Sequence, residues 1–139
     1  MNAYSLREIK VGQTEEFVVT LTEEKMSSFK ELSGDINPMH TDADYARNGG
    51  FKDRIVYGMC TASFYSTLVG VYLPGKYCIF KKCEVEWPAP VYIGDTLTVK
   101  GTVKEIDEKF STIRLYAEIR NQLGEKVSRA KLTVQIKEN

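Results

Sequence analysis

Hydrophobic and polar residues alternate strictly along three consecutive stretches in the second half of the chain, at 97–103, 113–119 and 130–136. An alternation of period two places the apolar side chains of a strand on one face of a sheet. Short polar turns at 107–109 and 121–125 join the stretches, which favours an antiparallel meander with one face in solvent. Residues 77–87 are expected to add a fourth strand, with a less regular pattern.

The first third of the chain is patterned mainly for helices, after a short β-prone run at 17–21. Thr22 is suited to cap a helix, because two glutamates follow it and apolar residues then recur at helical spacing. The pair Thr41 and Asp44 reads as a capping box that opens a second, short helix ending near 48–50.

The segment between Arg54 and Lys76 contains no charged residue. A transmembrane helix is the obvious alternative, but the segment contains several Ser and Thr residues and two internal glycines, and its flanks have no basic bias. We therefore expect a buried central helix, in which the small residues Gly58, Ala62, Ser66 and Gly70 recur every fourth position and allow close approach of a sheet or a ligand. One such helix with an antiparallel sheet predicts an α+β fold.

The composition is that of a globular protein without the excess positive charge that indicates binding to nucleic acid or to an anionic membrane. The length of 139 residues predicts a single domain spanning 1–139. Lys+Arg and Asp+Glu are equal at 19 each, so neither nucleic acid nor an anionic membrane is an expected partner. The first ten residues have no apolar run, so no secretory signal peptide is expected.

The cysteines and the single histidine argue against a metal site. Cys60, Cys78 and Cys83 have no metal-ligand spacing, and one histidine cannot complete a zinc site with them. Reduced thiols in a cytosolic protein are the expected state.

The segment 32–40 carries the candidate chemistry. It places Asp35 and His40, the only histidine, five positions apart in a stretch that its Gly, Asn and Pro content predicts to be a loop. Histidine titrates near neutrality, and a neighbouring carboxylate can share proton transfer with it. The alternative is an ordinary turn in which the aspartate only caps the next helix.

The same segment resembles the signature of the MaoC-like, R-specific enoyl-CoA hydratases, which reads Ser-Gly-Asp-x-Asn-Pro-x-His. Every fixed position of that signature is present between Ser33 and His40. The sequence at 55–59, Ile-Val-Tyr-Gly-Met, is similar to a second signature of this family, and 91–95 matches the entry to its next strand. The resemblance implies a hot-dog fold, in which an antiparallel sheet wraps around a long central helix.

Carried over position by position, the resemblance implies that Asp35 and His40 form the catalytic pair. It also implies that the backbone N–H of Gly58 binds the developing oxyanion and that Ser66, on the central helix, assists in positioning the substrate. The chemistry of these groups agrees, because an unhindered N–H near a helix N-terminus is a suitable oxyanion donor. Asn37, followed by a proline, would shape the loop so that the pair converges.

The resemblance implies a hydro-lyase without a cofactor or metal, acting on a trans-2-enoyl thioester of coenzyme A or acyl carrier protein. It further implies a homodimer, and the cysteine usage together with the first ten residues predicts a cytoplasmic location. One position departs from the family pattern: Tyr57 stands where histidine is common, and a phenol donates a hydrogen bond but does not titrate near pH 7.

Two other functions compete with this interpretation. A hot-dog thioesterase would usually carry its catalytic carboxylate on the central helix, but no acidic residue lies between Arg54 and Lys76. A non-catalytic acyl-thioester-binding module would not need the pair of Asp35 and His40.

Overall fold

The computed structural model describes all residues from 1 to 139 and contains one five-stranded antiparallel sheet. Its strands are β1 (Thr14–Thr20), β2 (Cys78–Glu86), β3 (Thr96–Asp107), β4 (Thr112–Arg120) and β5 (Lys126–Ile136). The α-helices are α1 (Glu23–Ser33), α2 (Pro38–Thr41), α3 (Ala43–Asn48) and α4 (Gly58–Thr67), and a π-helical turn, Leu68–Tyr72, continues α4.

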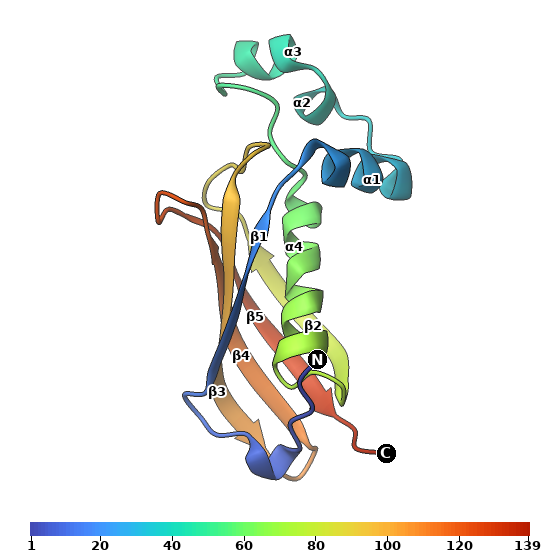
Figure 1. Ribbon diagram of the computed structural model, residues 1–139, viewed down its shortest axis with the longest axis vertical. Helices are drawn as coiled ribbons and strands as arrows, with labels where there is room; N and C mark the ends of the chain where they lie inside the picture. The colour runs from blue at the N-terminus through green and yellow to red at the C-terminus, as the bar shows by residue number, and fades with distance from the viewer.

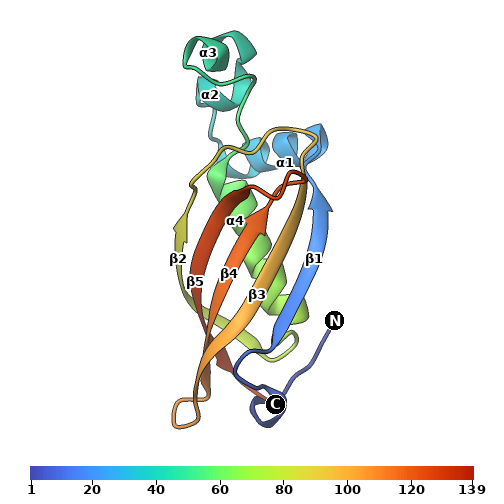
Figure 2. The same ribbon diagram turned by 90° about the vertical axis from the view of Figure 1, so that its left-hand side faces the viewer.

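The strands lie side by side in the order β1-β3-β4-β5-β2, and the sheet curves around α4 (Figures 1 and 2). The predicted meander is confirmed, because β3 pairs with β4 and β4 pairs with β5, all antiparallel. The predicted fourth strand is also present, as β2 at the edge next to β5, with an irregularity in the register between Phe80 and Lys82. The α+β prediction therefore holds.

The core lies between the inner face of the sheet and α4. The apolar residues of the three alternating stretches are buried, as their pattern predicts. Gly101 in β3 permits a close approach of the turn that continues α4, since a Cβ atom there would stand 2.8 Å from Cδ2 of Leu68. The hydroxyl of Tyr65 on α4 donates to Oγ of Ser128 on β5 at 2.9 Å.

The expected role of the small-residue stripe at the sheet was wrong. Ser66 is exposed, and a Cβ atom on Gly70 would meet nothing within 4 Å. The large side chains of Tyr65 and Leu68 make contact with the sheet instead, at Ser128 and at Gly101. Ser66 and Gly70 therefore do not pack on the sheet, whereas Ala62 lies against the core.

Helices α1, α2 and α3 lie together at one end of the molecule, beyond the start of α4, and both chain termini lie toward the other end (Figures 1 and 2). The predicted cap of α1 is confirmed, since Oγ1 of Thr22 accepts the Lys25 N–H at 3.2 Å. The predicted capping box of Thr41 and Asp44 at α3 was wrong, and a single cap lies one residue later than Thr41. The cap is Asp42, whose carboxylate accepts the Tyr45 N–H at 3.1 Å, because the hydroxyl of Thr41 instead donates to the carbonyl of Asn37.

No helix in the structure combines the length and the apolar character needed to cross a bilayer. The three cysteines are unpaired. Burial raises the pKa of the Cys78 thiol to about 11 and also raises the pKa of the Cys60 thiol.

Candidate active site

The segment with Asp35 and His40 is shaped by a succession of local hydrogen bonds. Gly34, with a left-handed φ of +73°, ends α1. Oδ1 of Asp35 then accepts the N–H of Asn37 at 3.0 Å, and Oδ1 of Asn37 accepts the N–H of Met39 at 2.9 Å. Asn37 thereby caps α2, and Pro38 occupies its first position. The prediction that the loop extends to His40 was wrong, since this cap starts a helical turn that contains the histidine.

His40 is half-buried and fixed by a backbone carbonyl. Its Nδ1 lies 2.8 Å from the carbonyl oxygen of Ile55, and the N–H of Ile55 donates to the carbonyl of Met39 at 3.1 Å. A carbonyl oxygen only accepts, so Nδ1 carries a proton. In the neutral ring, Nε2 is then the nitrogen with a free lone pair, available to take a proton from a bound molecule.

Tyr57, the last residue before α4, connects several parts of this region. Its hydroxyl donates to the backbone carbonyl of Asp35 at 2.6 Å, and its ring lies against those of His40 and Phe29, at centroid distances of 4.1 and 4.9 Å. Burial raises the pKa of the Tyr57 phenol, and the Asp35 carboxylate raises it further. Tyr57 therefore remains a hydrogen-bond donor at neutral and moderately alkaline pH.

An ion pair fastens the same region to α1. The guanidinium of Arg54 donates to both carboxylate oxygens of Glu23, at 3.1 and 2.7 Å. This hydrogen bonding holds the pKa of Glu23 below its usual value and raises that of Arg54. The chain that leads into α4 is thus tied to the first turn of α1.

The N-terminus of α4 has no side-chain cap, and the indole of Trp87 packs against its first residue. The first N–H groups of the helix, including that of Gly58, therefore have no acceptor within the helix. Nε1–H of Trp87 donates to the carbonyl of Gly58 at 2.9 Å and lies 3.3 Å from Oγ1 of Thr61. A Cβ atom at Gly58 would stand only 3.0 Å from the indole ring. Glycine at this position allows the tryptophan to pack directly on the backbone.

A cavity of about 430 Å³ opens between these groups. Its walls are mostly apolar and come from the approach to α4, from its first turn and from the segment after β2; they are His40, Phe51, Ile55, Val56, Gly58, Thr61, Trp87, Pro88, Ala89, Pro90 and Val91. This volume lies in the range of small-molecule sites, and the histidine and the helix N-terminus are polar groups at its surface.

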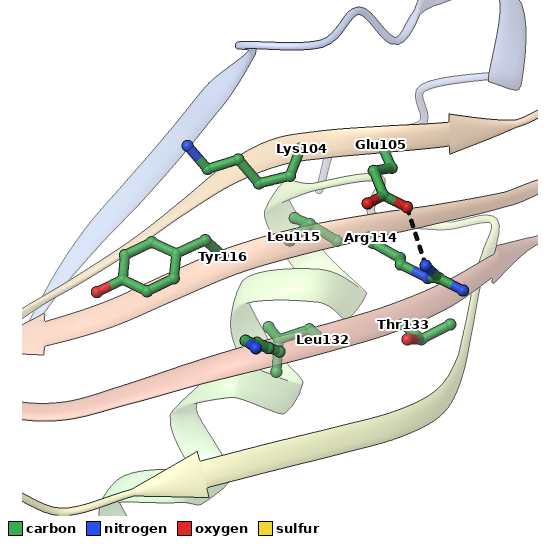
Figure 3. A pocket seen from close by; sticks show the side chains of 8 residues that line it. Lys104, Glu105, Arg114, Leu115, Tyr116, Leu132 and Thr133 are labelled. Atoms are coloured by element: carbon green, nitrogen blue, oxygen red, sulfur yellow. Dashed lines mark hydrogen bonds and ion pairs between the residues drawn. The ribbon is translucent and has the colours of Figure 1, made fainter.

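Another hollow, of about 570 Å³, lies on the outer face of the sheet (Figure 3). Its rim consists of charged side chains, including the ion pair between Arg114 and Glu105 at 2.9 Å. None of the predicted site residues lines it. Although it is larger, it offers no general base beside an oxyanion donor, so we assign the chemistry to the cavity at His40.

The structure brings together only some of the predicted site residues. His40 and Gly58 share the cavity, whereas the exposed Asp35 does not line it and is connected to His40 through Tyr57. Asn37 caps a helix. Ser66 lies eight residues after Gly58, or about 12 Å further along the helix, and is exposed.

Sequence reasoning missed Trp87 as a site residue. It follows β2 and reaches Gly58 across 29 sequence positions. No local pattern indicates such a contact; the only available signal was that Trp87 is the sole tryptophan and precedes an interruption of the sheet by Pro88.

Comparison with known proteins identifies a family model and several named relatives that match this chain. The sequence model of the MaoC like domain matches residues 7–123. An (R)-specific enoyl-CoA hydratase of Rhodospirillum rubrum is 40% identical over 109 residues, which are 77% of this chain and 76% of the relative. One of Aeromonas caviae is 32% identical over 120 residues, covering 86% and 90%.

Solved structures agree with this relationship. The unliganded R-hydratase PhaJ1 of Pseudomonas aeruginosa superposes with a TM-score of 0.90 at 31% identity, covering 97% of this chain and 86% of that one. The (R)-hydratase of A. caviae superposes with a TM-score of 0.89 at 30% identity, covering 94% and 99%. The predicted hot-dog fold is confirmed by these neighbours, and the chain belongs to the MaoC-like domain family.

Proposed function

We propose that this protein is an (R)-specific enoyl-CoA hydratase, which reversibly adds water to a trans-2-enoyl thioester to give the (R)-3-hydroxyacyl thioester. The observation that supports it most is the shared cavity of His40 and Gly58. It combines a histidine whose Nε2 is free with an uncapped helix N-terminus, within mostly apolar walls. An enoyl thioester requires these three properties: a base for water, a donor for the thioester oxygen and an apolar site for the acyl chain.

In the proposed reaction, Asp35 and His40 hold one water molecule. As its oxygen bonds to C3 of the substrate, the pair removes a proton from the water, and the electrons of the double bond move toward the thioester oxygen. The N–H of Gly58 stabilises the negative charge that develops there. A proton delivered by the same pair to C2 completes the addition, so that the elements of one water molecule enter the product.

The other predicted site residues have supporting roles in this proposal. Asn37 keeps Asp35 and His40 on a fixed turn, since it accepts from the first turn of α2 and donates to Asp35. Ser66 assists in positioning a part of the substrate that extends beyond the cavity along α4. The absence of any carboxylate on α4 favours hydration over a thioesterase reaction that uses an acid on this helix.

We further propose that residues 1–139 act as one domain in a cytoplasmic homodimer, with acyl-CoA as the substrate. The free edge of β2 and the exposed side chain of Met59 on α4 are available for a second copy. Light scattering of the purified protein tests this part of the proposal; a mass near 32 kDa is expected, twice the chain mass of 15.8 kDa, and a monomer at all concentrations contradicts it.

The activity is tested by the loss of the enoyl absorbance of crotonyl-CoA, with chiral analysis of the product and a thiol assay in parallel. We expect the (R)-alcohol and no free thiol. Thiol release identifies a thioesterase. Loss of absorbance only with crotonyl-acyl carrier protein would show that the substrate is carried by acyl carrier protein and not by coenzyme A. Binding of both thioesters without turnover would identify a binding module.

A further inference from the structure

We propose that Tyr57 is a positioning residue for this site, and that it holds Asp35, His40 and Gly58 in their relative places. This inference rests on the proposed hydratase function. It concerns the one position at which the chain departs from the usual histidine of its family, and it gives the tyrosine a role that does not require contact with the substrate.

The first observation is that one side chain reaches both members of the pair. The hydroxyl of Tyr57 donates to the carbonyl of Asp35 at 2.6 Å, while its ring packs on the imidazole of His40 at 4.1 Å. Tyr57 is also the direct neighbour of Gly58 in the chain. A shift of this residue would therefore change the distances among all three groups.

The second observation is that Asp35 has few other attachments. Residues 34–37 are exposed, and the carboxylate of Asp35 accepts only from the N–H of Asn37, two positions away. Its own N–H donates to the hydroxyl of Ser33. The bond from Tyr57 is thus the only hydrogen bond that fastens residues 34–36 to a distant part of the chain.

The third observation is where Tyr57 lies. Tyr57 is only 2% exposed and does not line the 430 Å³ cavity; it lines a separate hollow of about 100 Å³ that His40 also borders. The tyrosine therefore supports the imidazole without lining the cavity. The raised pKa of its phenol keeps the donor intact, whereas a histidine at this position would titrate in the neutral range.

The chain offers a matched control for the hydroxyl of Tyr57. Tyr65 is also buried, at 1% exposure, and its hydroxyl also makes one bond as a donor, to Ser128 at 2.9 Å. Tyr57→Phe and Tyr65→Phe each remove one oxygen and one such bond from the interior. Both should lower the melting temperature by similar amounts, but only one bond leads to the site.

We expect Tyr57→Phe to lower kcat for hydration about tenfold, the rate factor that corresponds to one ordinary hydrogen bond, with KM within about twofold of wild type. For Tyr65→Phe we expect kcat within about twofold. Equal losses in both variants would reduce Tyr57 to a structural role, and an unchanged kcat in Tyr57→Phe would also overturn the proposal.

A second readout does not depend on activity. His40 is the only histidine, so its ring signals in ¹H–¹⁵N NMR spectra are assigned without ambiguity. We expect wild type and Tyr57→Phe to keep the proton on Nδ1, and Tyr57→Leu to mix the tautomers, because an imidazole without the ring against it no longer stays on the carbonyl of Ile55. A proton that stays on Nδ1 in Tyr57→Leu would refute the support from this ring. If wild type lacked hydratase activity, the proposed function would fail while this spectrum still tested the contact.

Discussion

The inner face of the sheet and the segment around Asp35 are organised in opposite ways. In β3, β4 and β5 the inward side chains are almost completely buried, so each makes many equivalent contacts. Residues 34–37 are exposed and depend on a few individual hydrogen bonds. The difference indicates that the sheet supplies stability, whereas the geometry of the site depends on single contacts whose loss costs activity more than folding.

The largest effect on stability is expected in the sheet. Leu115→Ala removes a side chain that is 2% exposed, and such substitutions cost about 2–5 kcal/mol because a cavity remains. Urea unfolding measures the loss, and kcat of the folded fraction should stay within about twofold of wild type. A marked fall of kcat without a loss of stability would contradict the view that the sheet supplies stability and the segment around Asp35 supplies the geometry of the site.

Gly58→Ala should affect activity most strongly among the glycine changes. Its Cβ atom would stand 3.0 Å from the indole of Trp87, so the ring must give way by a few tenths of an ångström at the first turn of α4. We expect kcat/KM for crotonyl-CoA to fall about 10- to 100-fold, within the range for a disturbed oxyanion donor or a misplaced substrate.

Gly70→Ala is the matched control, because nothing lies within 4 Å of its added Cβ atom. We expect unchanged activity and a stability equal to wild type or higher by up to about 1 kcal/mol, from the helix propensity of alanine. Equal activity of the two alanine variants would show that the packing of Trp87 on Gly58 is irrelevant to the reaction.

A smaller effect is expected at Ser66, which is exposed on α4 and about 12 Å from Gly58 along the helix. Ser66→Ala should lower kcat/KM less than about tenfold and leave the melting temperature unchanged, since it removes one hydroxyl at the surface. The hydration assay with short and medium acyl chains measures it. A loss as large as that of a His40 variant would place Ser66 among the catalytic groups.

The smallest effect is expected on the outer face of the sheet. Arg114 and Glu105 form an ion pair at 2.9 Å, with both side chains 65% exposed. Exposed pairs contribute little, so Arg114→Ala should change stability by no more than about 0.5 kcal/mol and activity not at all. Urea unfolding and the hydration assay check both expectations, and a large loss of activity would assign a function to the hollow on this face.

The sequence predicted the strands of the sheet correctly but misplaced the helix boundaries near the site. The alternation of period two predicted β3, β4 and β5 because burial of one face is repeated at every second residue. The helical turn at His40 and the cap at Asp42 were mispredicted, since competing side-chain bonds of neighbouring residues decide such boundaries.

For the site, the motif identified Asp35, His40 and Gly58, and the structure places the last two on one cavity. The contacts of Tyr57 and Trp87 could not be predicted, because they join residues 22 and 29 positions apart through tertiary packing alone.

The most direct test of the account measures kcat/KM for crotonyl-CoA hydration in wild type, Asp35→Asn, His40→Ala and the double variant. If the two groups act on one water molecule, removal of either should lower kcat/KM about 10²- to 10⁴-fold. The double variant should then be only slightly less active than the less active of the two single variants. The melting temperature of Asp35→Asn should stay near wild type because the residue is exposed, and His40→Ala should lower it modestly because the variant loses the bond to the carbonyl of Ile55. Activity of either single variant within tenfold of wild type would contradict the proposed pair.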